Sequence, residues 1–209
     1  KRFGANKDMV LEDFGRDIRL FEPLAKKHSI DFLCADYTKK ESFVMKRKGI
    51  RFIVKPVTFF TAFWFLGQVG SLIKKENYDL IVATSDPLIG AVASHYSKKY
   101  GIPMVYDLMD NFEIYGTYRI PFVAYLHRKA VRDSEMVLVV SESLKKYVLK
   151  SRKKQVHVIQ NGFDSSLFRP IGKNKARKKL KLPLNSKIIA YIGNIEKLNS
   201  KIGAFITVR

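Results

Sequence analysis

The chain has 209 residues, 46% of them hydrophobic, and a formal net charge of +20. This composition is typical of a globular protein and excludes a disordered or collagen-like chain. The single cysteine, Cys34, excludes an internal disulfide framework, and we interpret it as a small buried side chain. The length accommodates one large domain, or one domain and part of another.

The positive charge is concentrated in one stretch. Residues 145–187 contain fourteen Lys or Arg residues and a single acid, Asp164. Such a basic field favours anionic partners, namely phosphates, anionic lipid headgroups or nucleic acid. A solvated surface that keeps the protein in solution is the alternative interpretation. The residues alone leave both open.

Hydrophobic periodicity predicts strands and helices that alternate along the chain. The predicted strands are short apolar runs at 30–35, 51–54, 80–84, 104–108, 136–140 and 156–160. The predicted helices cover 17–27, 85–99, 120–132 and 142–149. Ser85-Asp86-Pro87 and Ser141 are typical helix starts, and Gly101 is a typical stop. Strands joined in this way predict an α/β fold with a doubly wound parallel sheet.

An uncharged stretch of 18 residues, 56–73, lies within this pattern and is rich in aromatic side chains. Its length is at the lower edge of what spans a membrane. Because it falls between two predicted strands, we interpret it as a largely buried core helix. An aromatic face that dips into a bilayer, or a true membrane span, are the alternatives.

Polar residues lie at or just past the carboxyl ends of the predicted strands, where doubly wound folds bind ligands. These residues are Ser85, Asp107, Asp110, Ser141 and Asn161, and Asn111 and Glu142 directly follow two of them. A carboxylate there can accept hydrogen bonds from sugar hydroxyls or orient an attacking hydroxyl. Capping of loops and helices is the competing interpretation for each residue.

The sequence lacks the common motifs for binding dinucleotides, nucleoside triphosphates or metals and for serine hydrolase chemistry. The sequence contains no G-x-G-x-x-G, no phosphate-loop lysine motif and no G-x-S-x-G elbow. The four histidines are scattered and form no H-E-x-x-H. We therefore expect no protein-bound metal and no cofactor.

The chain changes character after the last predicted strand. Residues 161–173 are rich in turn formers and are interpreted as a linker. A short basic helix is predicted at 175–182 and a strand at 187–192. We place a domain boundary near Pro170, so that residues 1–170 form one domain and residues 171–209 begin a second.

Three stretches resemble glycosyltransferase family 4 and related GT-B enzymes. They are YDLIVAT with IPMVYDLMD (78–84 and 103–110), MVLVVSESL (136–144) and VIQNGFDSSLFRP (158–170). The third is similar to the family's connector between its two domains. The resemblance extends over about 14–193.

The resemblance implies two Rossmann-like domains, of which the first binds the acceptor and the second a nucleotide-activated sugar. Asp110 matches the acidic position that faces the cleft. Asn161, Gly162 and Asp164 match the connector. Gly193 matches the glycine near the donor phosphates, whereas Asn194 stands where the family has Arg. By the same resemblance, the family's first strand precedes residue 1 and its donor-gripping glutamates follow residue 209.

We therefore expect an acceptor-side fragment of a retaining, hexosyl-type glycosyltransferase, inactive by itself. The intact enzyme is expected to use a nucleotide-sugar and a cell-surface polysaccharide or glycolipid, in the cytoplasm and peripheral to the inner face of the membrane. The alternatives are a non-enzymatic basic module that binds nucleic acid or an anionic membrane surface, and another GT-B enzyme such as a sugar-nucleotide epimerase. Nucleic acid ranks below the others because the aromatic residues do not interleave with the basic run.

Overall fold

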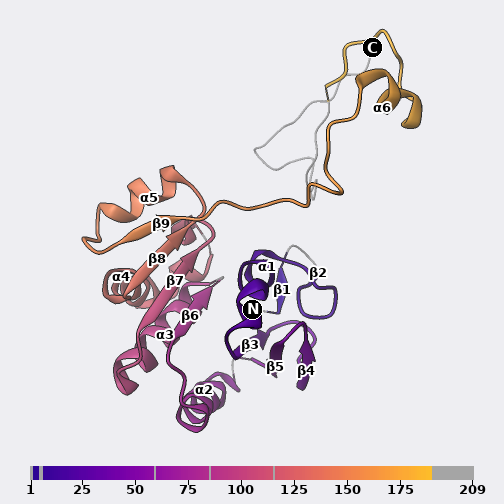
Figure 1. The fold of residues 1–209 in the computed structure, drawn as a ribbon. Coiled ribbons are helices and arrows are strands. Elements are labelled where there is room, and N and C mark those ends of the chain that lie inside the picture. The colour runs from indigo at the N-terminus through magenta and orange to yellow at the C-terminus, as the bar shows by residue number, and fades with distance from the viewer. Residues whose placement is uncertain (1, 5–6, 59, 85, 115, 190–209) are drawn as a thin grey trace. The chain divides into compact units, whose positions relative to one another are not determined.

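The computed structural model describes residues 2–4, 7–58, 60–84, 86–114 and 116–189. The chain divides into two compact units, Lys1–Asn161 and Gly162–Arg209 (Figure 1). Between β9 (Val156–Val158) and α6 (Lys173–Lys179), residues 159–172 contain no helix or strand. The boundary near Pro170 stays a prediction.

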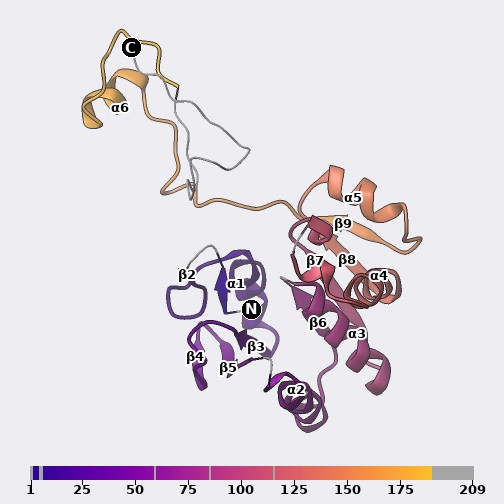
Figure 2. The ribbon, with the colours of Figure 1, turned by 180° about the vertical axis from the view of Figure 1, so that it is seen from behind.

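A four-stranded parallel sheet forms the centre of the larger unit. Its order is β6 (Ile81–Thr84), β7 (Met104–Leu108), β8 (Met136–Val139) and β9 (Val156–Val158). The helices α3 (Pro87–Tyr100), α4 (Val123–Asp133) and α5 (Glu142–Leu149) connect and flank these strands (Figures 1 and 2). Its apolar core includes the fully buried Tyr106, Val137 and Val139. The predicted α/β, Rossmann-like architecture is confirmed.

The earlier strands form a separate sheet. β3 (Ile30–Asp36) and β5 (Ile50–Pro56) are parallel, and β4 (Phe43–Arg47) pairs antiparallel with β5. The sequence did not predict β4, because its apolar residues are few and basic residues follow them. A short hairpin of β1 (Phe3–Gly4) and β2 (Lys7–Asp8) was also missed. Cys34 is buried in the core of this sheet, as predicted.

The helix predicted at 17–27 consists of two segments. It begins as α1 (Arg16–Phe21) and continues as a 3-10 turn, η1 (Glu22–Lys26), with Pro23 in its first turn. Proline has no N–H to donate to the preceding turn, so the regular helix ends before it.

The predicted caps of two helices are confirmed. The Asp86 carboxylate accepts a hydrogen bond from the Leu88 N–H at 2.9 Å, at the start of α3. Gly101 ends α3 with a φ of 67°, a left-handed conformation that glycine adopts without strain. Ser141 Oγ accepts from the Leu144 N–H at 3.2 Å, at the start of α5.

The uncharged stretch forms α2 (Ala62–Glu76), which is buried only in its second half. Val69 and Ile73 pack into a core with Tyr96 of α3. Phe63 and Trp64 are 85% and 61% exposed, so the interpretation as a largely buried helix is wrong for the first half. Within the described residues, no helix is both long enough and apolar enough to cross a membrane.

The contact between α3 and β7 leaves no room for a side chain at Gly90. A methyl group added there would overlap the hydroxyl of Tyr106, which is fully buried. We expect Gly90→Ala to lower the free energy of unfolding by about 1–3 kcal/mol through overpacking. Gly67→Ala in α2 is the matched control, because a methyl group there meets nothing within 4 Å. It should raise stability by about 0.5–1 kcal/mol, and equal effects of the two changes in urea titrations would contradict the prediction.

The smaller unit contains α6 (Lys173–Lys179), which ends three residues before the predicted end of that helix, residue 182. Lys181, just after it, has a φ of 54° that a right-handed helix cannot accommodate. The Arg177 guanidinium donates to the carbonyls of Pro183 at 3.0 Å and Ser186 at 2.8 Å, and so folds the following segment back onto α6. Of the strand predicted at 187–192, residues 187–189 are not in a strand, and the rest lies outside the described residues.

Candidate functional site

The carboxyl end of β7 carries a buried ion pair. Asp107 is fully buried, and both of its carboxylate oxygens accept hydrogen bonds from Arg16, at 3.1 Å from Nη2 and 3.2 Å from Nε. Arg16 is the first residue of α1, and its side chain is only 10% exposed. This two-point contact holds the start of α1 against the end of the central sheet.

Arg16 also reaches the chain that follows β9. Its Nη1 donates to Asn161 Oδ1 at 3.1 Å and to the carbonyl oxygen of Gln160 at 3.4 Å. One guanidinium thus connects two of the predicted site residues, Asp107 and Asn161. Sequence reasoning missed Arg16, although a cation at the amino end of a helix opposes the helix dipole and so breaks a local rule.

Burial determines the electrostatics of Asp107. Loss of water raises the pKa of this carboxyl above its ordinary value, and the hydrogen bonds from Arg16 oppose that rise. A carboxylate that is fully enclosed and held by an arginine is suited to fixing the shape of the sheet edge. It is less suited to meeting a sugar hydroxyl directly.

Asp110 lies in a different environment two residues beyond β7. It is exposed, and its Oδ1 accepts a hydrogen bond from the Asn111 N–H at 2.8 Å. Asn111 Oδ1 in turn accepts from the Glu113 N–H at 3.1 Å, at the start of the 3-10 turn η2 (Phe112–Ile114). Asn111 therefore caps a turn, whereas Asp110 presents a carboxylate to solvent at the edge where parallel sheets bind ligands.

The other predicted site residues are not all brought together. Ser141 caps α5, and Glu142 is exposed in the first turn of that helix. Gly162 and Asp164 are exposed in the smaller unit, and Asp164 Oδ1 accepts from the Ser166 N–H at 2.9 Å. The remaining three predicted residues lie outside the described residues: Ser85, Gly193 and Asn194.

A cluster of hydrogen-bonded side chains surrounds Glu113, close to Asp110. The sequence did not predict this cluster. Glu113 accepts hydrogen bonds from the Tyr118 hydroxyl at 2.9 Å, from Arg128 Nε at 3.3 Å, and from the Tyr147 hydroxyl. A small cavity of about 30 Å³ lies beside it and is lined by Asp110 as well. These contacts pin the loop after β7 to α4 and α5, and so fix the backbone that carries Asp110.

No metal centre is found in the part of the chain that the structure describes. No group of three or more His, Cys, Asp or Glu residues there could hold a metal ion.

The sequence model of Glycosyltransferase Family 4 matches residues 19–167. This chain belongs to Glycosyltransferase Family 4. The match contains β7, β8, β9 and the carboxylates at the sheet edge. No curated protein matches the chain. Arg16, which holds that edge together, lies just before the matched region.

This family 4 domain contains a buried histidine that should make its stability depend on pH. His127 of α4 is 6% exposed, and its Nδ1 lies 3.0 Å from the Tyr106 hydroxyl. Burial lowers the pKa of His127 to about 4, because the imidazolium loses its hydration. The folded protein therefore binds fewer protons than the unfolded chain between its folded pKa and the ordinary value of about 6.5.

We expect acidification from pH 7 to pH 5 to lower the free energy of unfolding by about 2 kcal/mol through this residue alone. The window lies above the titration of ordinary carboxyl groups. His127→Gln should lose less stability over the same range, and urea titrations at both pH values measure the difference. His157→Gln, at an exposed position of β9, is the control. Equal losses in all three proteins would contradict a buried, neutral His127.

Proposed function

We propose that this family 4 glycosyltransferase transfers a hexosyl-type sugar from a nucleotide-sugar to a cell-surface polysaccharide or glycolipid, with retention of anomeric configuration. The main support is the sheet edge within the family match. There an exposed carboxylate, Asp110, lies on a loop fixed by the Glu113 cluster, next to the buried Arg16–Asp107 pair. The proposal needs no cofactor besides the nucleotide-sugar substrate.

Each carboxylate has a separate part in this proposal. Asp110 accepts a hydrogen bond from the acceptor hydroxyl and orients it. Asp107 acts through Arg16, which positions Asn161 at the start of the connector. Asn111, Ser141 and Glu142 shape the acceptor side from the two neighbouring loops. The proposal assigns Ser85 to acceptor binding, and Gly193 and Asn194 to contact with the donor phosphates.

The test uses the intact enzyme from its source cells, incubated with a panel of radiolabelled nucleotide-sugars and a glycolipid extract of those cells. Transfer of label into the lipid fraction from one donor is the expected result. Analysis of the product by NMR should show the anomeric configuration of the donor. Hydrolysis or epimerisation of the nucleotide-sugar without transfer would instead favour the epimerase alternative.

A cytoplasmic location, peripheral to the inner face of the membrane, forms part of the proposal. The exposed aromatic residues at the start of α2 and the charge of +20 support it. We expect the protein to sediment with phosphatidylglycerol vesicles at low salt and to be released as salt increases. Phe63→Ala should weaken this binding, whereas Phe163→Ala, also exposed but in the connector, should not. Failure to bind at low salt would contradict the membrane location.

In the alternative interpretation as a basic binding module, some of the basic side chains would not be available to a ligand, because they are hydrogen-bonded within the fold. Arg152 is 2% exposed and donates to the carbonyl oxygens of Val131 at 2.6 Å and Ser134 at 2.9 Å. Arg177 likewise donates its hydrogen bonds to backbone carbonyl groups in the segment after α6. Two arginines of the basic run are therefore committed within the fold. For this reason we rank nucleic-acid binding below glycosyl transfer.

A further inference from the structure

A hollow of about 490 Å³ lies between α2 and the sheet of β3 and β5. Side chains alternate between the two faces of a strand. Phe32 and Phe52 point into the core of this sheet, whereas Leu33 and Ile53 line the hollow. The face of β3 and β5 turned toward α2 is therefore apolar only in its middle, between the Asp31–Arg51 pair and Lys55, and it is incompletely filled.

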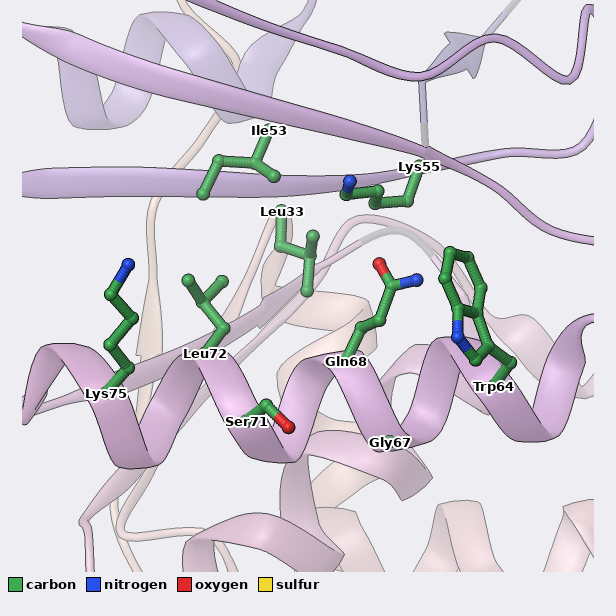
Figure 3. Close-up of a pocket in the computed structure, with 9 residues that line it drawn as sticks. All are labelled: Leu33, Ile53, Lys55, Trp64, Gly67, Gln68, Ser71, Leu72 and Lys75. Atoms are coloured by element: carbon green, nitrogen blue, oxygen red, sulfur yellow. The ribbon is translucent and has the colours of Figure 1, made fainter.

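One side of α2 supplies the opposite wall. Trp64, Gln68, Leu72 and Lys75 follow one another at helical spacing and rise from α2 toward the strands (Figure 3). The other side of the helix carries Val69 and Ile73, which are packed against α3. Four of the lining side chains are apolar; Gln68 and Ser71 are the uncharged polar ones, and Gln68 rises toward the strands (Figure 3).

Ionic contacts pin the carboxyl end of α2 to the sheet. Arg51 on β5 donates to Asp31 on β3 at 2.8 Å and pairs with Glu76 of α2 at 3.0 Å. The Tyr78 hydroxyl also donates to Asp31. These contacts hold the helix at a fixed distance from the strands, so the hollow is formed in advance of any ligand. They also neutralise the acids beside it.

The charges that remain at the hollow are positive. Lys55 and Lys75 both line it, and among the described residues neither has an acidic partner within ion-pair distance. The amino end of α2 continues into the exposed aromatic rings of Phe60 and Phe63. The arrangement combines an apolar slot, flanking ammonium groups and an aromatic rim, and this combination is complementary to an anionic amphiphile.

We propose that this hollow binds one hydrocarbon chain of an anionic membrane phospholipid, with the phosphate beside a lysine. The inference rests on the proposed membrane attachment and makes it specific. One lipid chain would leave the bilayer and enter the hollow between α2 and the sheet. The exposed rings of Phe60 and Phe63 would contact the membrane surface at the same time.

Trp64 allows a direct test, because it is the only tryptophan in the chain and lines the hollow. The probes are phosphatidylglycerol vesicles with brominated acyl chains, and monomeric lysophosphatidylglycerol below its critical micelle concentration. We expect the brominated chains to quench most of the Trp64 fluorescence. Monomeric lysophosphatidylglycerol should bind saturably, and lysophosphatidylcholine more weakly.

Two substitutions should act in opposite directions on the lysolipid dissociation constant. Leu72→Gln makes the slot polar and should weaken binding about tenfold, whereas Gln68→Leu should tighten it several-fold. Both keep good helix formers in α2. Leu126→Gln is the matched control, since Leu126 is a half-exposed leucine of α4 away from the hollow. Circular dichroism verifies that each variant is folded.

The outcomes separate the two proposals. Sedimentation with vesicles but neither quenching nor lysolipid binding would overturn the hollow as a chain site and leave membrane attachment standing. Lysolipid binding that responds to Leu72→Gln, without vesicle binding, would overturn the bilayer as the source of the chain. Equal effects of Leu72→Gln and Leu126→Gln would contradict the hollow as the place of binding.

Discussion

Replacing Asp110 by Asn is expected to lower glycosyl transfer by the intact enzyme roughly 10²–10⁴-fold. The carboxylate is proposed to accept a hydrogen bond from the acceptor hydroxyl and so to orient it. An amide has a similar shape but lacks the negative charge, so it holds and orients that hydroxyl less firmly. The turnover number is the quantity to measure, at a saturating concentration of the nucleotide-sugar.

Stability distinguishes this effect from damage to the fold. Asp110 is exposed, so the melting temperature of Asp110→Asn should match that of the wild type. Asp79→Asn is the control and should keep full activity, because Asp79 is an exposed carboxylate two residues before β6. Near-normal turnover of Asp110→Asn would remove Asp110 from the proposed mechanism.

The central sheet could be predicted closely from the sequence because its signals are local. The predicted strand at 104–108 and the predicted helix at 142–149 match β7 and α5 to the residue. A short apolar run predicts β7, and a capping serine predicts the start of α5, so each signal lies within a few residues of the element. By contrast, β4 depends on pairing with β5, and its apolar run of three residues is followed directly by lysine and arginine.

The candidate site could be predicted only in part. The rule for parallel strands correctly pointed to Asp107 and Asp110 as neighbours of the sheet edge. It could not separate a buried carboxylate from an exposed one, because that difference comes from Arg16, which is 91 residues away from Asp107 in sequence. The burial of α2 was misjudged for a related reason. The sequence of an uncharged stretch does not show whether other elements of the fold pack against both of its halves.

Arg16→Ala is expected to be the most destabilising single change at this site. It would leave Asp107 fully buried without its cation, which typically costs about 3–5 kcal/mol. Arg19→Ala is the matched control in the same helix. Arg19 is 55% exposed and pairs with Asp13 and Glu22 at the surface, so its loss should cost about 1 kcal/mol or less. Urea titrations at pH 7 give both values, and similar losses would contradict a buried ion pair.

The pH dependence of Arg16→Ala provides a second and independent check. Burial already raises the pKa of Asp107, and without Arg16 the opposing hydrogen bonds are gone. The folded state then binds a proton more readily than the unfolded chain, so acidification stabilises the variant through this group. The deficit of Arg16→Ala relative to the wild type should therefore shrink as the pH falls from 7 to 5. Arg16→Met combined with Asp107→Leu should recover most of the lost stability, because an apolar pair needs no hydration. A deficit that is independent of pH would mean that Arg16 stabilises the edge through its contacts with Gln160 and Asn161 instead.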